Sequence, residues 1–402
     1  MIKHTLRQYL RFLSMLLLFT LPRYVPAEEL MQPFAPRSAT YLAQGGSSVA
    51  VVKGYEALFT NPAAFAASRG SLTLMVNPWG YGNPRDLLVS AGAIEPYEGY
   101  EGPATTFSDP TGIADYLAYA SKNGFGGGAG FGIGWVGRGL GLGAVSSTDI
   151  FLFGSPFPGA VKGYVQSDFA LVAGLGFTLM NSKVIQLRAG ADLRPTVRFY
   201  SPITAETLLT MLSDPSSTNP LNSSTMYSGS ALAIDAGIQG SLFENLLFGL
   251  SIRDLFGTRY SMAGYPLGDW LKEAQTGSIP SGGGAAGTYL VPMNISAGLG
   301  YHVNMGVLSS LIDPTVHLEL ADPLGVIREN KTPWSLLHIG AEAKLLRFIS
   351  LRAGLNQGYL TAGAGVKLLF IDINMAAFTR ELGRYAGDHP SSGFALEAAL
   401  RF

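Results

Sequence analysis

The sequence predicts an all-β fold, a transmembrane antiparallel β-barrel of about 14 strands with a small N-terminal hatch, and three observations support this. The 402-residue chain is 47% hydrophobic but only 14% charged, whereas an average soluble domain is about 25% charged. Many segments alternate large apolar residues with small or polar ones, which is the period of a strand. The chain ends on Phe402, after apolar residues at every second position.

The composition excludes several classes of protein. Glycine fills 51 positions, about twice the usual share, yet there is no collagen period and no low-complexity segment. The absence of cysteine excludes disulfide scaffolds, thiolate metal sites, cysteine nucleophiles and a lipid-modified N-terminal cysteine. A net charge of −1 without a basic stripe argues against a nucleic-acid partner.

Residues 1–27 are expected to be an export signal. The basic residues Lys3, Arg7 and Arg11 precede an apolar run at 12–21, and a small-residue cleavage site follows at 25–27. The apolar run is too short to span a bilayer comfortably. A basic residue just before the cleavage site leaves an uncleaved anchor as the alternative.

Residues 28–70 do not alternate and are expected to form the hatch. Asn61 can cap a short helix over about 62–68 that begins at Pro62, a favourable first position because proline lacks the N–H that would be unpaired there. A barrel of about fourteen strands has a lumen wider than its own side chains fill. We therefore expect a plug whose gate contains Asn61, Pro62, Ala63 and Phe65, with a helix packed elsewhere as the alternative.

Residues 71–402 are expected to form the barrel. In segment 185–194, Leu187 and Leu193 face one way while Arg188 and Arg194 face the other. Similar alternation recurs at 168–179, 230–242, 294–302, 315–320, 336–344, 348–356, 360–368 and 371–377. Long loops are expected near 95–128, 200–229 and 255–292, on the extracellular side. A soluble β-sandwich is the alternative, but its outer face would carry more Lys and Glu.

The last strand carries the most specific signal. Phe394, Leu396, Leu400 and Phe402 lie on one face, and Glu397 lies on the other. This strand resembles the final strand of bacterial outer-membrane barrels, whose terminal Phe is an assembly signal. The resemblance implies the bacterial outer membrane, contact with outer-membrane lipid, and the barrel-assembly machinery as a partner.

Both ends of the mature chain resemble the FadL-type family of outer-membrane long-chain fatty-acid transporters, as a divergent member. The similar segments are 46–50, 57–63 with its Asn61-Pro62-Ala63 signature, 352–358 and 379–383. Ala64 departs from the family pattern, which continues with glycine. The resemblance implies a 14-stranded barrel closed by the hatch, and passive uptake of long-chain fatty acids or similar hydrophobic ligands captured outside and released inward or sideways. We expect a monomer.

Loop 200–229 contains apolar residues where water is expected. Leu208, Leu209 and Leu212 could form the face of a short helix that captures an aliphatic chain, since each buried methylene contributes about 0.8 kcal/mol. The alternative is packing of this loop on the barrel rim.

An anionic headgroup would need a cation beside the apolar path. The alternation of the predicted strands places five cations on the lumen face: Arg188, Arg194, Arg253, Arg352 and Lys367. The alternative is that they pair with lumen carboxylates, for which Asp192, Asp235, Glu342 and Asp372 are the candidates.

No motif supports catalysis, a metal or a cofactor. The G-x-G-x-x-G match at 132–137 is not followed by a capped helix, so its glycines are better explained by close strand packing or a kinked wall. His317 and His338 lack metal-ligand spacing, and no G-x-S-x-G elbow occurs. The alternatives left open are an outer-membrane phospholipase or protease, a general porin, and a structural or secretion-associated barrel that binds a protein partner.

Overall fold

A computed structural model of the chain describes residues 36–82, 95–98, 124–153, 162–203, 224–275, 286–382 and 385–402, together with Phe34 and Val89. The expected export signal at 1–27 and the capture residues Leu208, Leu209 and Leu212 lie outside the described residues.

The described chain consists of strands preceded by three short helices. The N-terminal helices are α2 (Ala39–Ala43), η1 (Gly54–Phe59) and η2 (Pro62–Ala66). The strands are β1 (Ser71–Tyr81), β2 (Phe125–Gly137), β3 (Leu140–Phe153), β4 (Lys162–Asn181), β5 (Ile185–Ile203), β6 (Thr225–Leu242), β7 (Leu246–Arg253), β8 (Thr258–Pro266), β9 (Ala286–Val291), β10 (Asn294–His302), β11 (Ile312–Ala321), β12 (Leu337–Leu345), β13 (Ile349–Asn356), β14 (Tyr359–Leu368), β15 (Ile371–Glu381) and β16 (Pro390–Arg401).

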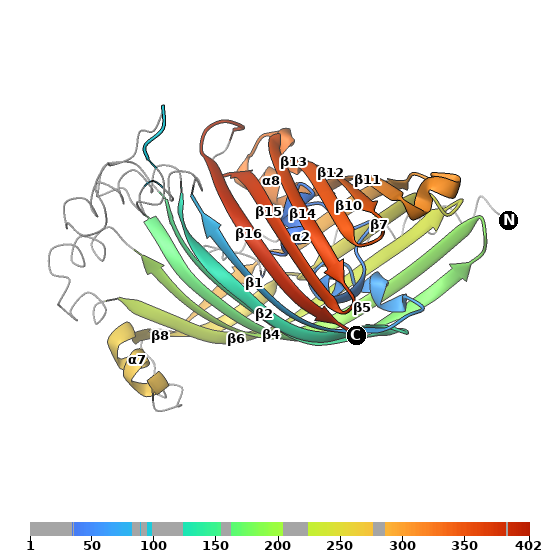
Figure 1. Cartoon of the computed structure of the whole chain (residues 1–402). Coiled ribbons are helices and arrows are strands. Elements are labelled where there is room, and N and C mark those ends of the chain that lie inside the picture. The colour runs from blue at the N-terminus through green and yellow to red at the C-terminus, as the bar shows by residue number, and fades with distance from the viewer. Residues whose placement is uncertain are drawn as a thin grey trace.

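The strands close into a barrel (Figure 1). Each pairs antiparallel with its neighbours, β1 pairs with β16, and β5 pairs with β6 to complete the circle. Both β7 and β8 pair with β6. On their other side, β7 pairs with β10 and β8 pairs with β9. Thus β7–β8 is one barrel strand interrupted at 254–257, and β9–β10 is another interrupted at 292–293. The sixteen segments therefore make the 14 barrel strands that the sequence predicts.

The outer surface of the barrel is apolar. In β16, the side chains of Phe394 and Leu396 are 38% and 46% exposed. The alternate residues Ala395 and Glu397 are at most 1% exposed. This arrangement is the reverse of a soluble protein, because the leucines face outward and the carboxylate faces inward. It matches the apolar band of a bacterial outer-membrane barrel, which faces lipid.

The two ends of the barrel differ in the length of their connections. The strands are joined at one end by short turns such as 138–139, 182–184 and 369–370, which is the periplasmic end of such barrels. Phe402 lies at this end, where its ring stacks on Phe370; its role as an assembly signal stays a prediction. The longest connection at this end contains η4 (Gly306–Ser310).

The extracellular end carries the other helices and corrects one predicted loop. Helix α7 (Leu267–Gln275) follows β8, and α8 (Pro323–Glu329) with η5 (Pro333–Leu336) joins β11 to β12. The prediction of a single loop at 255–292 is wrong, because this range contains strands β8 and β9. The predicted loops 95–128 and 200–229 are shorter than expected, because β2 begins at Phe125, β5 ends at Ile203 and β6 begins at Thr225. In the described ranges, no helix has the length and apolar character needed to cross a membrane.

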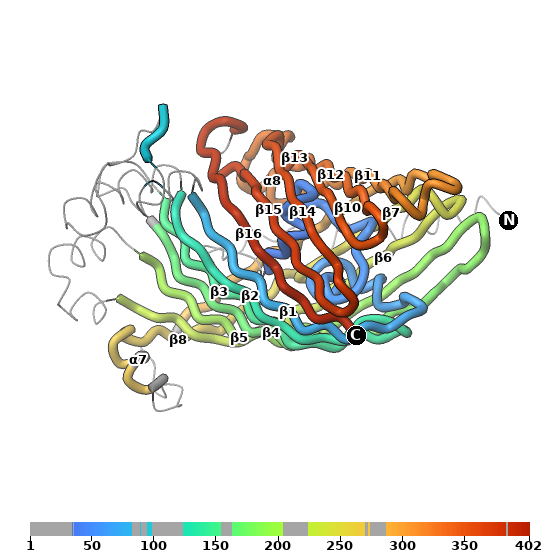
Figure 2. Tube along the Cα trace, viewed as in Figure 1, coloured from blue at the N-terminus to red at the C-terminus, as the bar shows by residue number. Residues whose placement is uncertain are grey.

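The N-terminal segment lies inside the barrel (Figure 2). Helix η2 contacts β2 to β6, η1 contacts β1, β2 and β3, and α2 contacts β13 to β16. The hatch therefore touches most of the circumference of the wall.

Candidate functional site

Asn61 fastens the hatch to the wall. It is fully buried, and its Oδ1 accepts a hydrogen bond from the Ala63 backbone N–H at 3.1 Å, which caps η2. Its Nδ2 donates to the Val49 carbonyl at 3.0 Å and to the Ile238 carbonyl of β6 at 3.1 Å. The helix predicted at 62–68 is present as a 3₁₀ turn over Pro62–Ala66, in which Pro62, Ala63 and Phe65 are buried; their role as a gate stays a prediction.

Two buried carboxylates of the wall hold the hatch backbone. Glu397 of β16 accepts from the Ser38 hydroxyl at 2.6 Å and from the Ala39 N–H at 3.1 Å. Glu319 of β11 accepts from two successive backbone N–H groups at 48–49, at 2.8 and 2.9 Å. These contacts pair hatch donors that would otherwise be buried without partners.

The two lumen histidines also contact the hatch backbone. His317 Nε2 lies 3.1 Å from the Ser47 carbonyl, and His338 Nδ1 lies 2.7 Å from the Gly45 carbonyl. Among the described residues, no group of His, Asp and Glu has the arrangement of a metal site. Their position therefore assigns these histidines to hatch docking.

Glycines line the wall where the hatch approaches it. A methyl group at Gly190 would lie 2.2 Å from the Pro62 carbonyl oxygen, and one at Gly132 would overlap the Tyr55 hydroxyl at 1.6 Å. Other wall glycines that face the hatch in this way are Gly134, Gly141, Gly174, Gly176, Gly237, Gly249, Gly340, Gly354 and Gly363. In the run at 132–137, Gly132 and Gly134 thus make room for the hatch residues Tyr55 and Leu58.

Aromatic side chains gather on the extracellular side of the hatch. We call Trp79, Tyr81, Phe151, Tyr164 and Phe378 the outer aromatic cluster. The ring centroids of Tyr81 and Phe151 are 5.0 Å apart, and those of Tyr81 and Phe378 are 6.2 Å apart. Helix α2 packs against the cluster through Ala39, Leu42 and Ala43. The rings therefore rest on the hatch.

A single carboxylate organises this cluster. Asp149 accepts hydrogen bonds from Trp79 Nε1 at 2.7 Å, from the Tyr81 hydroxyl at 2.9 Å and from the Tyr164 hydroxyl at 3.0 Å. The Arg37 guanidinium of the hatch lies 4.0 Å from Asp149 and 5.4 Å from the centre of the Tyr81 ring. Both oxygens of Asp149 are thus used within the protein.

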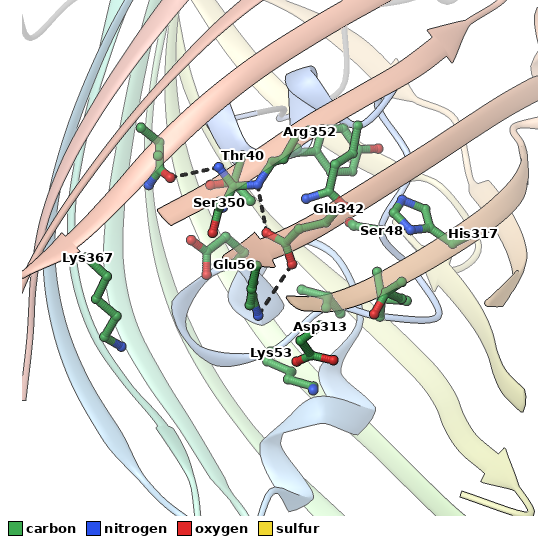
Figure 3. A pocket seen from close by; sticks show the side chains of 18 of the residues that line it. Thr40, Ser48, Lys53, Glu56, Asp313, His317, Glu342, Ser350, Arg352 and Lys367 are labelled. Carbon is green, nitrogen blue, oxygen red and sulfur yellow. Dashed lines mark hydrogen bonds and ion pairs between the residues drawn. The ribbon is translucent and has the colours of Figure 1, made fainter. Parts of the chain in front are cut away.

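A polar cavity of about 550 Å³ lies on the periplasmic side, between the hatch and strands β7 and β10 to β16 (Figure 3). Charged side chains of both signs line it, among them Lys53, Glu56, Glu342, Lys344, Lys367 and Arg401. We call this space the inner cavity. It differs sharply in chemistry from the outer aromatic cluster.

The five predicted headgroup cations all face the lumen, but three of them have protein partners. Arg194 is fully buried and contacts Asp235 at 3.0 Å and Asp254 at 2.9 Å. Arg253 donates to the Phe59 carbonyl of the hatch. These two cations hold the wall and the hatch rather than standing open to a ligand.

The other three predicted cations lie toward the periplasmic end. Arg352 donates to Glu342 and to Asn374, each at 2.8 Å (Figure 3). Arg188 and Lys367 make no hydrogen bond or ion pair with any residue in the described part of the chain. Lys367 lines the inner cavity, so these two remain candidates for binding a headgroup.

Two hatch residues at the inner cavity were missed by sequence reasoning, because parity arguments apply only to strands. Enclosure by the barrel, together with Lys344, lowers the pKa of Lys53. Burial alone would raise the pKa of the Glu56 carboxyl, but the Arg401 guanidinium at 2.6 Å outweighs it and lowers this pKa. The Glu56–Arg401 pair is therefore a further attachment between hatch and wall.

Comparison with solved structures finds barrels of similar construction. The toluene transporter TbuX of Ralstonia pickettii has a TM-score of 0.48 at 12% identity, covering 91% of this chain and 97% of that chain. A Pseudomonas aeruginosa FadL homologue has a TM-score of 0.47 at 13% identity, with 94% and 99% covered. The Pseudomonas putida toluene transporter TodX has a TM-score of 0.42 at 12% identity, with 93% and 98% covered. No protein-family model and no curated protein sequence matches the chain.

Proposed function

We propose that this chain is a FadL-type outer-membrane channel for the passive uptake of hydrophobic small molecules, long-chain fatty acids among them. The observation that carries the proposal is the outer aromatic cluster, which covers the extracellular side of the hatch. These rings are buried against the hatch, so a hydrophobic ligand would contact them once part of the hatch is displaced. Ligand sites of this kind are mostly apolar with a few fixed polar groups.

The fit of the hatch favours a ligand-specific channel over a general porin. A general porin needs an open aqueous lumen, whereas here the hatch is fastened by Asn61, Glu319 and Glu397. A ligand that passes must displace part of the hatch or travel around it. We place the movable part near Asn61 and Pro62, where the 3₁₀ turn η2 meets the wall.

Two further elements belong to the proposal. Leu208, Leu209 and Leu212 would capture the ligand above the barrel, and Arg188 and Lys367 would attract an anionic headgroup at the periplasmic side. These are the two predicted headgroup cations that make no hydrogen bond or ion pair with another described residue, so an anionic ligand could pair with them.

The test is binding by the folded protein. Refolded residues 28–402 in detergent are titrated with a fluorescent long-chain fatty acid, and oleate and a short-chain acid serve as competitors. We expect saturable binding that only oleate displaces, and weaker binding after Leu208, Leu209 and Leu212 are replaced by Ser. A folded barrel that binds no lipid, or that conducts ions freely with its hatch in place, would contradict the proposal.

A further inference from the structure

Positive charge surrounds the periplasmic mouth of the barrel. Arg138, Lys183 and Arg347 lie in the turns that follow β2, β4 and β12, and Arg69 lies just before β1. Their side chains are exposed, and none forms a hydrogen bond or ion pair with a residue that the structure describes. We call these four residues the basic rim. In the order of the sheet, the rim runs from β5 through β1 and β16 to β12.

The positive charge continues into the inner cavity. Lys53 of the hatch and Lys367 of β14 project into this space (Figure 3). Both side chains are exposed and lack a hydrogen-bond or ion-pair partner within the described ranges. The centre of the mouth is therefore positive as well as its edge.

The carboxylates of this end do not balance these cations. Glu244, in the turn after β6, is exposed and has no partner in the described part of the chain. The other described side-chain carboxylates near the mouth already have partners: Glu56 and Asp372 pair with Arg401, Glu342 with Arg352, and Asp313 with His302. An excess of positive charge is left for a partner outside this chain.

Apolar side chains stand beside the basic rim. Val307 of η4 is 93% exposed, and Leu369, in the turn after β14, is 90% exposed. Both lie in connections between strands and are far more exposed than the lipid-facing Phe394 and Leu396. Exposed apolar residues bordered by polar ones are typical of an interaction surface.

We propose that the periplasmic mouth is a docking surface for a soluble protein with an acidic face, and that this protein receives the hydrophobic molecule released by the channel. A lipid headgroup can reach the rim, but Lys53 and Lys367 lie within the ring of strands, where bilayer lipid has no access. A small anion neutralises only one or two cations. An acidic protein face covers edge and centre together, and complementary charge steers such a partner to the mouth.

The handover rests on the proposed function, whereas the docking surface does not. A hydrophobic molecule that leaves the inner cavity would expose apolar surface to water, which is unfavourable. Carboxylates of the partner pair with Lys367, the cation that an anionic headgroup would also use. Docking therefore competes with the ligand for this cation and favours its release.

The first measurement is the binding of a fluorescent oligoglutamate peptide to the purified, folded protein in nanodiscs of neutral phospholipid, which leave both ends of the barrel accessible. We expect saturable binding at low ionic strength that weakens as salt screens the charges. Arg138→Asn combined with Lys183→Gln and Arg347→Asn should weaken it by roughly tenfold. Asn suits the two arginine positions, because their φ angles are 57° and 66° and Asn tolerates this conformation.

Two matched variants control for charge and for folding. Lys272→Gln, Arg328→Gln and Lys331→Gln together remove as many positive charges from the extracellular end, where each cation pairs with a nearby carboxylate. This variant should bind the peptide as the wild type does. Arg138→Lys with Arg347→Lys keeps the charge of the rim and should also leave binding unchanged.

The second measurement identifies the class of partner in living cells. The photoreactive residue p-benzoylphenylalanine replaces Leu369 in the exposed turn, and the cells are irradiated. We expect one adduct with a soluble, acidic protein, and its loss when the three rim substitutions are added at equal levels of folded barrel. Absence of a protein adduct, or an adduct with a basic protein, would overturn the proposal.

Two further outcomes would also overturn it. Equal peptide binding by the wild type and the folded rim variant would show that the rim does not attract acidic groups. Loss of bound phosphatidylglycerol from the rim variant in native mass spectrometry, with peptide binding unchanged, would assign these cations to lipid. Either result leaves oleate binding untouched, and absence of saturable oleate binding would contradict the proposed function separately.

Discussion

The two sides of the hatch present a ligand with opposite environments. On the extracellular side, aromatic rings pack on α2, and the Asp149 carboxylate among them accepts three hydrogen bonds. On the periplasmic side, the inner cavity holds charges of both signs, and Lys367 projects into it without a partner (Figure 3). A hydrophobic molecule would gain free energy in the first region and little in the second. In the proposed function, capture would take place on one side of the plug and release on the other.

The largest expected effect comes from removing the barrier between the two regions. Gly190→Leu would place side-chain atoms where the Pro62 carbonyl now lies, so the hatch must move away from the wall. Because the lumen of a 14-stranded barrel is wide once unplugged, we expect ion conductance in planar bilayers to rise by roughly tenfold or more. Ala191→Leu, at the adjacent exposed position, is the control. Unchanged conductance in a folded Gly190→Leu barrel would mean that the hatch does not block ions.

A second prediction concerns the buried network that holds the interrupted part of the wall. Arg194→Met leaves Asp254 buried without its cation and leaves Asp235 with only the more distant Arg253 guanidinium, at 3.6 Å. Loss of one partner from a buried ion pair costs about 3 to 5 kcal/mol, so we expect a lower urea midpoint for unfolding of the barrel. Lys272→Met removes an exposed pair on α7 and should have little effect. Equal midpoints for the two variants would contradict the assignment of Arg194 to wall stability.

A third prediction uses pH to loosen the hatch from the periplasmic side. The pKa of Glu56 is lowered in the folded protein, so its pairing with Arg401 is present above the ordinary carboxyl pKa of about 4.3 and is lost as the pH falls through the folded value. We expect leak conductance to rise at acidic pH, and Glu56→Gln to raise it already at pH 7. The variant should also lack this part of the pH response. An identical acid response in Glu56→Gln and wild type would exclude Glu56 as the titrating group.

The smallest expected effect tests whether the outer rings contact the ligand. Phe153 is partly exposed and stacks on Phe151 at 5.6 Å. An aromatic contact is worth about 0.5 to 1.5 kcal/mol, so Phe153→Ser should weaken fatty-acid binding by roughly 2-fold to 12-fold. Phe243→Ser, in an exposed periplasmic turn, is the control. Equal effects of Phe153→Ser and Phe243→Ser on binding would show that the Phe153 ring does not contact the ligand.

Much of the barrel could be predicted because lipid on one side and a filled lumen on the other impose a two-residue period. This rule works for β5 and β16, where leucines or aromatics point outward. It fails for β8, whose outward positions include Arg259 and Ser261. These polar residues belong to the part of the strand that extends toward the extracellular side, so the apolar half of the pattern is missing. The short β9 offers too few residues for a period to be recognised.

The candidate site was less accessible to sequence reasoning. Parity placed Arg194, Arg253 and Arg352 correctly in the lumen, but whether a cation has a partner depends on strands distant in the chain and on the hatch. Arg380 of β15 shares its face with Phe378, yet its position over the Tyr81 and Phe151 rings is visible only once β1, β3 and β15 are brought together.

The glycine-lined fit of the hatch bears on how the molecule is assembled. Along the chain the hatch precedes all the strands that the structure describes, while β16, which completes the circle by pairing with β1, follows the others. Glu397 and Arg401 on that last strand bind the hatch at Ser38 and Glu56. The contacts that seat this edge of the plug can therefore form only when the strand that closes the barrel is in place, which links the closing of the seam to the final seating of the plug.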